Sequence, residues 1–168
     1  MLTPKMQKAL NTHLNEEFYS SYLYLSMAAY FEAKNLKGFA NWMRIQSTEE
    51  QMHGMKFFNF ILQKGGKVSL MPIEAPKIEW KSISEVFADT LKHERKISGL
   101  INKIVEAAIT EKDYATHTFL QWFVTEQVEE EANVEEIIQK IEMIGDNKSG
   151  LYMLDNELGS RTAAPAGE

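Results

Sequence analysis

The chain has 168 residues, of which 44% are hydrophobic and 25% are charged, and it carries a formal net charge of -6. Its length suits one domain that buries roughly 70% of the surface of the unfolded chain, and zero cysteines exclude disulfides, iron–sulfur clusters and thiolate zinc sites. No apolar run reaches about 18 residues and no basic cluster occurs, so neither membrane insertion nor direct nucleic-acid binding is expected. The N-terminal segment lacks the apolar core of a secretory signal, which favours a cytoplasmic protein.

The first two predicted helices have clear boundary signals. Thr3 is placed to cap a helix whose first position is Pro4. Apolar residues then recur at steps of three and four, which predicts one long amphipathic helix. A short polar turn leads to Gly38, and a second helix is predicted from there to the glycine pair Gly65 and Gly66.

Two more long helices are predicted downstream. Ser82 and Glu85 match a capping box and open the third helix. Asp113 is placed to cap the fourth, which ends near Gly145. Strand patterns are nearly absent, so these four amphipathic helices predict an all-α fold, a four-helix bundle.

The four helices place residues 1–145 in the bundle. Residues 146–159 are expected to form a short fifth helix of the same domain, and residues 160–168 a flexible tail. The segment between the second and third helices contains Pro72 and Pro76 and has no helical period. About 17 extended residues cover roughly 56 Å, whereas a helix of about 28 residues is only about 42 Å long. This segment can therefore run the length of the bundle and make the second and third helices parallel.

Each of the four apolar stripes is interrupted at mid-helix by a carboxylate. A single glutamate in such a place is more often a hydrogen-bonded or partly solvated residue than a metal ligand. Four at similar depth repel one another in a core of low dielectric constant unless cations neutralise them. The four are Glu17, Glu50, Glu94 and Glu130; His53 shares a helix face with Glu50, and Gln127 shares one with Glu130.

Two divalent cations would balance the charge of four carboxylates. Oxygen-rich ligation with one neutral imidazole suits iron or manganese better than zinc, and these residue types do not distinguish iron from manganese. Bundles with two metals commonly use one glutamate on each of two helices and Glu-x-x-His on the other two. Glu50 and His53 match that motif, whereas Gln127 and Glu130 depart from it. We expect Glu50 to bridge two metals, and the metal beside Glu130 to bind more weakly.

Several motifs resemble those of the non-haem ferritins of bacteria and archaea, and the likeness covers nearly the whole chain. The motifs are NEEFYSSYLYLSM, STEEQMHGMKF, KHE and FLQWFVTEQVEEE. The resemblance implies a ferritin-like four-helix bundle with one long crossover and a two-iron ferroxidase centre. It places one iron among Glu17, Glu50 and His53, the other among Glu50, Glu94 and Glu130, and Gln127 beside them.

The resemblance also implies a third iron site close to this centre. Its residues would be Glu49, Glu126, Glu129 and Glu130. Taken without the resemblance, Glu49, Glu126, Glu129 and Glu131 indicate no more than a solvated acidic face, which is the usual meaning of such runs.

Tyr24 follows Glu17 by seven residues on the same stripe, so its phenol could approach the centre. The alternative is a core tyrosine bonded to a buried acceptor such as Glu94, and both can hold together.

Haem and further histidine ligands are not expected. Haem-binding bacterioferritins carry a ligand methionine directly after the bridging glutamate; this chain has Gln51 there, and Met52 falls one step further round the helix. Three histidines lie off the metal-bearing stripes and are assigned no role: His13, His93 and His117.

The resemblance implies a ferroxidase that oxidises Fe²⁺ with O₂ or H₂O₂ and stores ferric mineral. It further implies a hollow homo-oligomeric shell of 24 subunits, with the fifth helix at subunit contacts. Three alternatives are a di-iron oxidase or peroxidase without storage, a DNA-protecting mini-ferritin, and a purely structural bundle. A mini-ferritin places its ligands between subunits, and a structural bundle has no reason to hold four acids at one depth.

Overall fold

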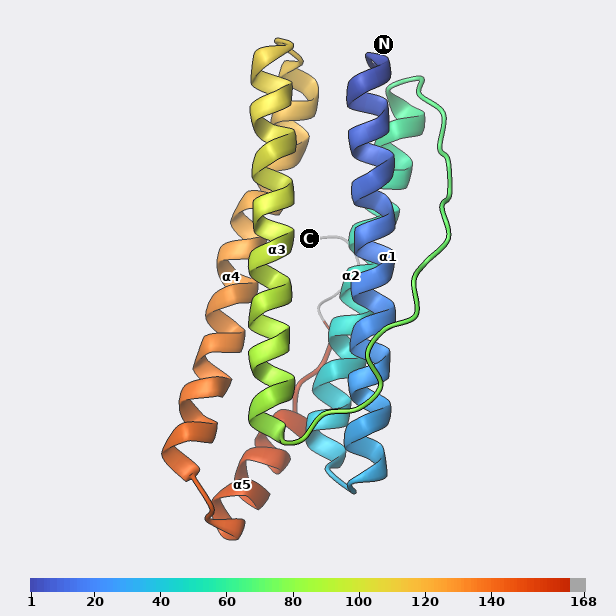
Figure 1. Ribbon diagram of the computed structural model, residues 1–168. Helices are drawn as coiled ribbons and strands as arrows, with labels where there is room; N and C mark the ends of the chain where they lie inside the picture. Colours follow the sequence, from blue (N-terminus) through green and yellow to red (C-terminus); the bar gives the residue numbers. More distant parts are fainter. Residues whose placement is uncertain (164–168) are drawn as a thin grey trace.

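The computed structural model describes residues 1–163, which form five α-helices and no strand. They are α1 (Pro4–Ala33), α2 (Lys37–Gln63), α3 (Ile83–Thr110), α4 (Tyr114–Ile144) and α5 (Lys148–Gly159). The first four helices lie side by side as a bundle, and α5 crosses one end of it (Figure 1). The predicted all-α four-helix bundle with a short fifth helix is confirmed. None of the helices in the described range is both long and apolar enough to span a membrane.

The predicted helix starts agree with the observed ones to within one residue. Thr3 accepts a hydrogen bond from the Met6 amide at 3.1 Å, and Asp113 accepts one from the Thr116 amide at 3.1 Å. Ser82 accepts from the Glu85 amide at 3.1 Å, as the capping box predicts. In a capping box the glutamate also accepts a hydrogen bond from the amide of the cap residue. Here the Glu85 carboxylate accepts from the Lys81 amide instead of the Ser82 amide.

The end of α2 is fixed by Gly65, whose φ of +70° lies in the left-handed region that favours glycine. The Gly65 amide donates to the Leu62 carbonyl and the Gly66 amide donates to the Ile61 carbonyl, each at 2.9 Å. This is the paired hydrogen-bond pattern of a glycine-terminated helix, and it turns the chain out of the bundle.

The crossover of residues 64–82 runs along the outside of the bundle and makes α2 and α3 parallel, as predicted (Figure 1). Polar contacts with α1 fasten its first part. The Asn11 amide group donates to the Lys67 carbonyl at 3.0 Å, and its oxygen accepts from the Ser69 amide at 2.6 Å. Near the other end, Trp80 is buried and donates to Asp89 at 2.9 Å. The crossover is therefore an ordered part of the fold.

The fifth helix is packed against α2 by both apolar and polar contacts. Leu154 and Leu158 are buried within this chain. The Asp155 carboxylate accepts hydrogen bonds from the Gly38 and Phe39 amides, at 2.9 and 3.0 Å. Leu36, at the N-terminal boundary of α2, supplies no side-chain cap, so α5 caps α2 from a distance of more than 100 residues in sequence.

The predicted flexible tail comprised residues 160–168. Of these, 164–168 lie outside the described residues, whereas Arg161 makes several defined contacts that are taken up below.

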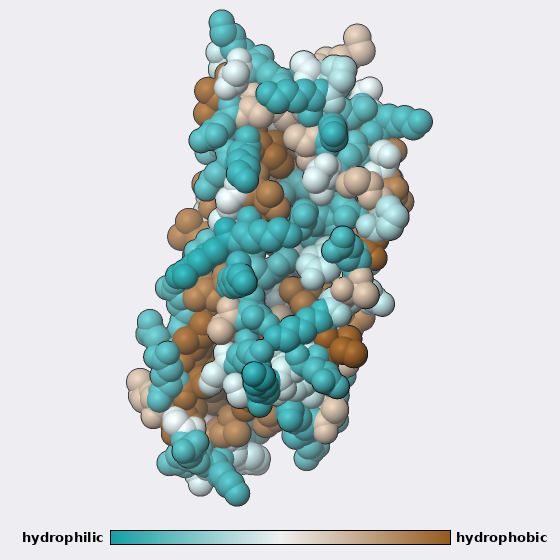
Figure 2. Space-filling view, viewed as in Figure 1, coloured by the Kyte–Doolittle hydropathy of each residue, from teal (hydrophilic) through white to brown (hydrophobic). Residues whose placement is uncertain are grey.

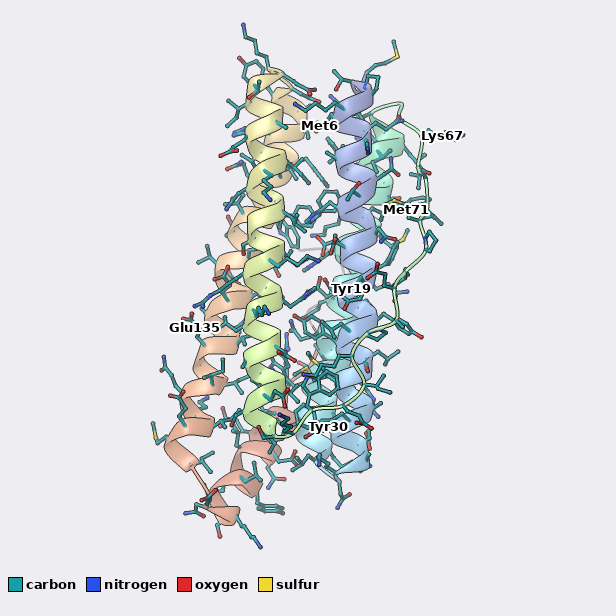
Figure 3. All side chains as sticks on the ribbon, in the orientation of Figure 1. Met6, Tyr19, Tyr30, Lys67, Met71 and Glu135 are labelled. Carbon is teal, nitrogen blue, oxygen red and sulfur yellow. The ribbon has the colours of Figure 1, made fainter. Side chains whose placement is uncertain are left out.

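A polar band divides the apolar core into two clusters. One cluster centres on Phe31, Phe39 and Phe87, and the other on Leu10, Phe57 and Phe123. The labelled Tyr19 marks the height of the band in Figure 3, where nitrogen and oxygen atoms from α1 and α3 meet between the ribbons. The buried polar residues at this height are Glu17, Ser20, Gln46, Ser47, Glu50, His53, Thr90, His93, Glu94, Gln127 and Glu130. Four carboxylates are thus enclosed between two apolar layers.

Candidate metal centre

One half of the polar band brings three potential ligands together. Glu17 comes from α1, and Glu50 and His53 lie one turn apart on α2. One ligand atom of each lies within 4.8 Å of the other two, and no other group of three such residues is found in residues 1–163. All three side chains are at most 6% exposed. Two carboxylates and an imidazole in this arrangement offer a buried site for one divalent cation.

His13 orients Glu17 within this site. Its Nε2 atom lies 2.9 Å from Glu17 Oε1, and its ring contacts Phe57 with centroids 4.7 Å apart. The second carboxylate oxygen, Oε2, is buried and has no hydrogen-bond partner among residues 1–163. A buried oxygen without a partner is costly, so Oε2 is the atom of Glu17 that suits a cation. Sequence reasoning missed His13, although its spacing of four residues from Glu17 puts both on one helix face.

The second half of the band is closed by hydrogen bonds between side chains. Glu94 accepts from the Tyr24 hydroxyl on one oxygen, and from Gln127 Nε2 at 3.0 Å on the other. Glu130 Oε2 accepts from Gln46 Nε2 at 2.8 Å. Glu94 and Glu130 therefore lie in the predicted layer but outside the group of three. The expected bond between Tyr24 and Glu94 is present, and Gln46 is a further polar residue of the band that was assigned no role from the sequence.

The two halves of the band differ before any metal binds. Glu17, Glu50 and His53 already converge, whereas both oxygens of Glu94 and one of Glu130 are held by neutral donors. A cation on the second side meets carboxylate oxygens that already accept these hydrogen bonds, so it competes with neutral donors. This difference adds to the absence of an imidazole beside Glu130 as a reason for weaker binding there.

Three residues of the expected third site, Glu49, Glu126 and Glu129, lie outside the band and partly in solvent, whereas the fourth, Glu130, belongs to the band. Glu126 Oε1 is 3.9 Å from His53 Nε2, and Glu49 Oε2 is 2.7 Å from an Arg161 guanidinium nitrogen. Glu129 is exposed. Burial raises the pKa of the Glu126 carboxyl, and the charges of Glu129 and Glu49 raise it further. The three acids are thus close enough to repel one another.

Burial governs the ionisation of the enclosed acids. It raises the pKa of Glu50 well above its usual value, and the neighbouring carboxylates raise it further, Glu94 most of all. Burial likewise raises the pKa of Glu94 to about 7 and that of Glu130 to about 8. Burial also opposes ionisation of Glu17, but the contact with His13 outweighs it and lowers the pKa. Ionisation of Glu17 is therefore favoured at neutral pH, whereas burial favours the protonated forms of Glu50, Glu94 and Glu130.

These pKa shifts predict how the metal-free protein responds to pH. In the folded protein the pKa values of Glu94 and Glu130 lie above the value of about 4.5 that each has in the unfolded chain. The stability that these neutral acids contribute is therefore lost progressively as pH rises from about 4.5 through about 7 to 8. Burial lowers the pKa of His53 and His93, so these histidines affect stability only below about pH 6.5. Between about pH 6.5 and pH 9, the melting temperature of the wild type is expected to fall relative to that of Glu130→Gln. Parallel melting curves for the two proteins across this range would mean that the buried acids are not under this strain.

Comparisons with known proteins agree with the fold. A model of the ferritin-like domain matches residues 7–144. The chain is 41% identical over 162 residues to a bacterial non-heme ferritin of Staphylococcus aureus (strain MRSA252), covering 96% of this chain and 98% of that protein. It is 42% identical over 161 residues to a bacterial non-heme ferritin of Bacteroides fragilis (strain 638R), covering 96% and 100%.

Solved structures from the archaeon Archaeoglobus fulgidus give the same result. An open-pore ferritin matches with a TM-score of 0.95 and 49% identity, covering 96% of this chain and 99% of that one. A closed form engineered by mutagenesis matches with a TM-score of 0.96 and 48% identity, covering 98% and 100%. With its crossover bundle and its band of buried carboxylates, the chain belongs to the ferritin family.

Proposed function

We propose that this protein oxidises Fe²⁺ at the polar band and stores the ferric product inside a hollow cytoplasmic shell of 24 copies. The observation that carries the proposal is the enclosure of four carboxylates and one imidazole, from four helices of one chain, between two apolar clusters. Such a group of acids is unfavourable in an empty core and becomes favourable when cations occupy it. Ferritins are the curated relatives of the chain, and iron storage is the role that defines their family.

The proposed reaction consumes two Fe²⁺ ions and one O₂. Each Fe²⁺ gives one electron, and O₂ takes both electrons and two protons to form H₂O₂, which can oxidise further Fe²⁺. Glu17, Glu50 and His53 hold one iron, and Glu50, Glu94 and Glu130 hold the other. The negative charge of the carboxylates favours Fe³⁺ over Fe²⁺, which helps to drive the electron transfer.

Two further side chains of the second half adjust the ligands. In the metal-free protein Tyr24 and Gln127 each occupy one oxygen of Glu94. Gln127 can release its bond when iron binds, and Tyr24 can keep Glu94 in place from the other oxygen. Tyr24 is fully buried, and burial raises its pKa well above the usual value, so it remains a hydroxyl donor at neutral pH.

Exposed apolar side chains support assembly into an oligomer. Much of the visible surface is hydrophilic, with separate hydrophobic patches (Figure 2). Large apolar residues that are at least 49% exposed include Tyr22, Leu25, Leu62, Leu70, Ile78, Tyr152 and Met153. Tyr152 and Met153 belong to α5, which is consistent with the expected role of this helix at subunit contacts. Side chains of this kind are commonly covered in interfaces.

The alternatives differ in where the ligands come from and in particle size. All proposed ligands of the two-iron centre lie within one chain, which disfavours a mini-ferritin with a site between subunits. A monomer or dimer has no interior in which to store mineral, so particle size separates a storage protein from a di-iron oxidase without storage.

An oxygen-pulse experiment tests the proposal. Metal-free protein is fractionated by size, loaded anaerobically with two Fe²⁺ per subunit, and mixed with O₂. We expect a shell-sized particle, complete oxidation in a single fast phase, and an iron-rich core after repeated additions. A monomer or dimer that oxidises iron without retaining it would support the oxidase alternative, and iron oxidised no faster than in buffer would refute both.

The asymmetry of the two halves predicts two binding steps. Titration of the metal-free protein with a redox-inert divalent cation such as Zn²⁺ is expected to show one tight and one weaker step at the two-iron centre, before any still weaker binding at the third site. His53→Ala should weaken the tight step by at least about tenfold, while Glu130→Ala should chiefly remove the weaker step. Equal affinities, or loss of the tight step in Glu130→Ala but not in His53→Ala, would contradict this assignment.

The third site predicts a separate effect on turnover. Glu129 is exposed and lies outside the enclosed layer, so Glu129→Gln should leave the first oxidation of two bound irons nearly intact. Later turnovers and the ratio of iron to O₂ consumed should change, because iron leaving the centre loses one of its next ligands. Stopped-flow absorbance and oxygen uptake measure the two effects. Disappearance of the first fast phase would place Glu129 in the two-iron centre itself.

A further inference from the structure

The chain segment after α5 places one side chain beside the acidic residues that lie outside the band. These outer acids are Glu49, Glu126 and Glu129, and the side chain is that of Arg161. The Arg161 guanidinium lies 2.7 Å from Glu49 Oε2, and its Cζ atom lies over the Trp42 ring, 4.8 Å from the centroid. The two charged side chains are only 24% and 13% exposed. The Asn41 amide donates to the Arg161 carbonyl at 3.1 Å, which fixes the backbone of this segment. Arg161 is therefore a positioned cation and not a loose surface side chain.

The Arg161 guanidinium is bound to the Glu49 carboxylate, which is one of the proposed ligands of a metal in the third site. Glu49, Glu126 and Glu129 repel one another, and a positive charge beside Glu49 reduces that repulsion. A guanidinium and a metal ion compete for the charge and the lone pairs of Glu49 Oε2. Partly buried, charge-assisted bonds of this kind are stronger than ordinary surface pairs.

A cavity beside Arg161 offers its side chain a second position. This surface cavity of roughly 320 Å³ is lined among others by Trp42, Lys140, Glu157 and Arg161 itself. Glu157 already pairs with Lys140 at 2.7 Å, and offers a carboxylate to a guanidinium that leaves Glu49. The stacking on Trp42 also holds one Arg161 nitrogen, Nη1, buried without a hydrogen-bond partner in residues 1–163. A carboxylate of the cavity lining, such as that of Glu157, would give this nitrogen a partner after such a move.

We propose that Arg161 is a built-in counter-ion of the outer acids that a metal has to displace from Glu49, so that the C-terminal segment sets the affinity of the third site. This inference rests on the proposed third site. It makes Arg161 a positioning residue: it exchanges with the metal for Glu49 and takes no part in the oxidation. It also predicts that the third site binds weakly, as suits a site through which iron passes.

The test is a calorimetric titration of the assembled, metal-free protein with Zn²⁺. In Arg161→Gln, the third and weakest step is expected to tighten by about tenfold, which is about 1.4 kcal/mol, while the tight first step stays within about twofold. The second step should change less than the third, although its ligand Glu130 also interacts with the charge of Arg161. The matched control is Lys140→Gln, which removes one positive charge from the same cavity without touching Glu49. It should change the third step by no more than about twofold. A third step that is unchanged or weakened in Arg161→Gln, or tightened equally in Lys140→Gln, would overturn the inference.

Glu129→Gln separates failure of the inference from failure of the third site. A third step that is present in the wild type, absent in Glu129→Gln and unchanged in Arg161→Gln would support the third site and refute the counter-ion role of Arg161. If no third step appears in either the wild type or Arg161→Gln, both fall. Zn²⁺-soaked crystals give an independent readout: the Arg161 guanidinium should have left Glu49 wherever zinc density contacts that carboxylate, and a guanidinium still bound to it would contradict displacement.

Discussion

Glu50→Gln is expected to slow the fast oxidation of bound Fe²⁺ by at least about 100-fold, while the metal-free protein melts at the same temperature as the wild type or higher. Mutation of a residue that only supports a metal ligand already lowers metal affinity or activity by about 10- to 100-fold. Glu50 is proposed to contact both irons directly, so its loss should cost at least as much. The amide keeps the shape of the carboxyl group but cannot bridge two cations as an anion. The effect on stability follows from burial and from the charges of Glu94 and Glu17, which together raise the pKa of Glu50. Glutamine cannot ionise, so the empty variant avoids the cost of a buried charge beside the other acids.

The experiment compares melts of wild type and Glu50→Gln, each with and without Fe²⁺ under nitrogen. Metal should raise the melting temperature of the wild type by mass action and that of the variant much less. Glu106→Gln is a charge-matched control, because Glu106 is exposed on α3. It should change neither oxidation nor the response to metal. A metal-free Glu50→Gln protein that melts well below the wild type would mean that this carboxylate serves the fold.

Gly38→Ala is expected to destabilise the protein by about 3 kcal/mol or more, the largest change in stability predicted for a single methyl group in this chain. A Cβ atom at this position would lie 1.5 Å from the Asp155 carbonyl oxygen, which is backbone and cannot turn aside. The helix α5 would have to move away from α2. That movement exposes Leu154 and Leu158 and breaks two amide bonds to the Asp155 carboxylate. Burial of one leucine side chain is worth about 1.5–3 kcal/mol, and a hydrogen bond to a charged group about 1.5–3 kcal/mol.

The matched control is Gly99→Ala. Gly99 lies within α3, and a Cβ atom there would meet nothing within 4 Å in this chain. Alanine in place of glycine inside a helix is expected to stabilise by roughly 0.5–1 kcal/mol. Thermal melts should therefore move in opposite directions for the two variants. Equal melting temperatures for Gly38→Ala and the wild type would show that α5 is not held at this contact.

The helices and the enclosed acids were predictable because local signals determine them. Thr3, Ser82 and Asp113 cap helices through bonds to amides three residues ahead, and such bonds depend only on nearby sequence. The spacing of the glutamates along each stripe predicted their common depth, and the length of residues 64–82 predicted the parallel crossover.

Contacts between distant segments were not predictable in the same way. Asp155 caps α2 from 117 residues away, and Arg161 pairs with Glu49 across 112 residues. No periodicity links such positions. Gln46 was also missed, since an amide in an apolar stripe reveals its role only when its partner Glu130, 84 residues away, is placed beside it.

Iron-edge anomalous diffraction from crystals soaked with Fe²⁺ under nitrogen shows where the protein binds iron. We expect two strong peaks per subunit inside the bundle. One should be bound by Glu17, Glu50 and His53, and the weaker one by Glu50, Glu94 and Glu130, with the Gln127 bond to Glu94 broken. Iron found only on the outer acids, or a polar band that keeps all its hydrogen bonds and binds no iron, would contradict the proposed two-iron centre.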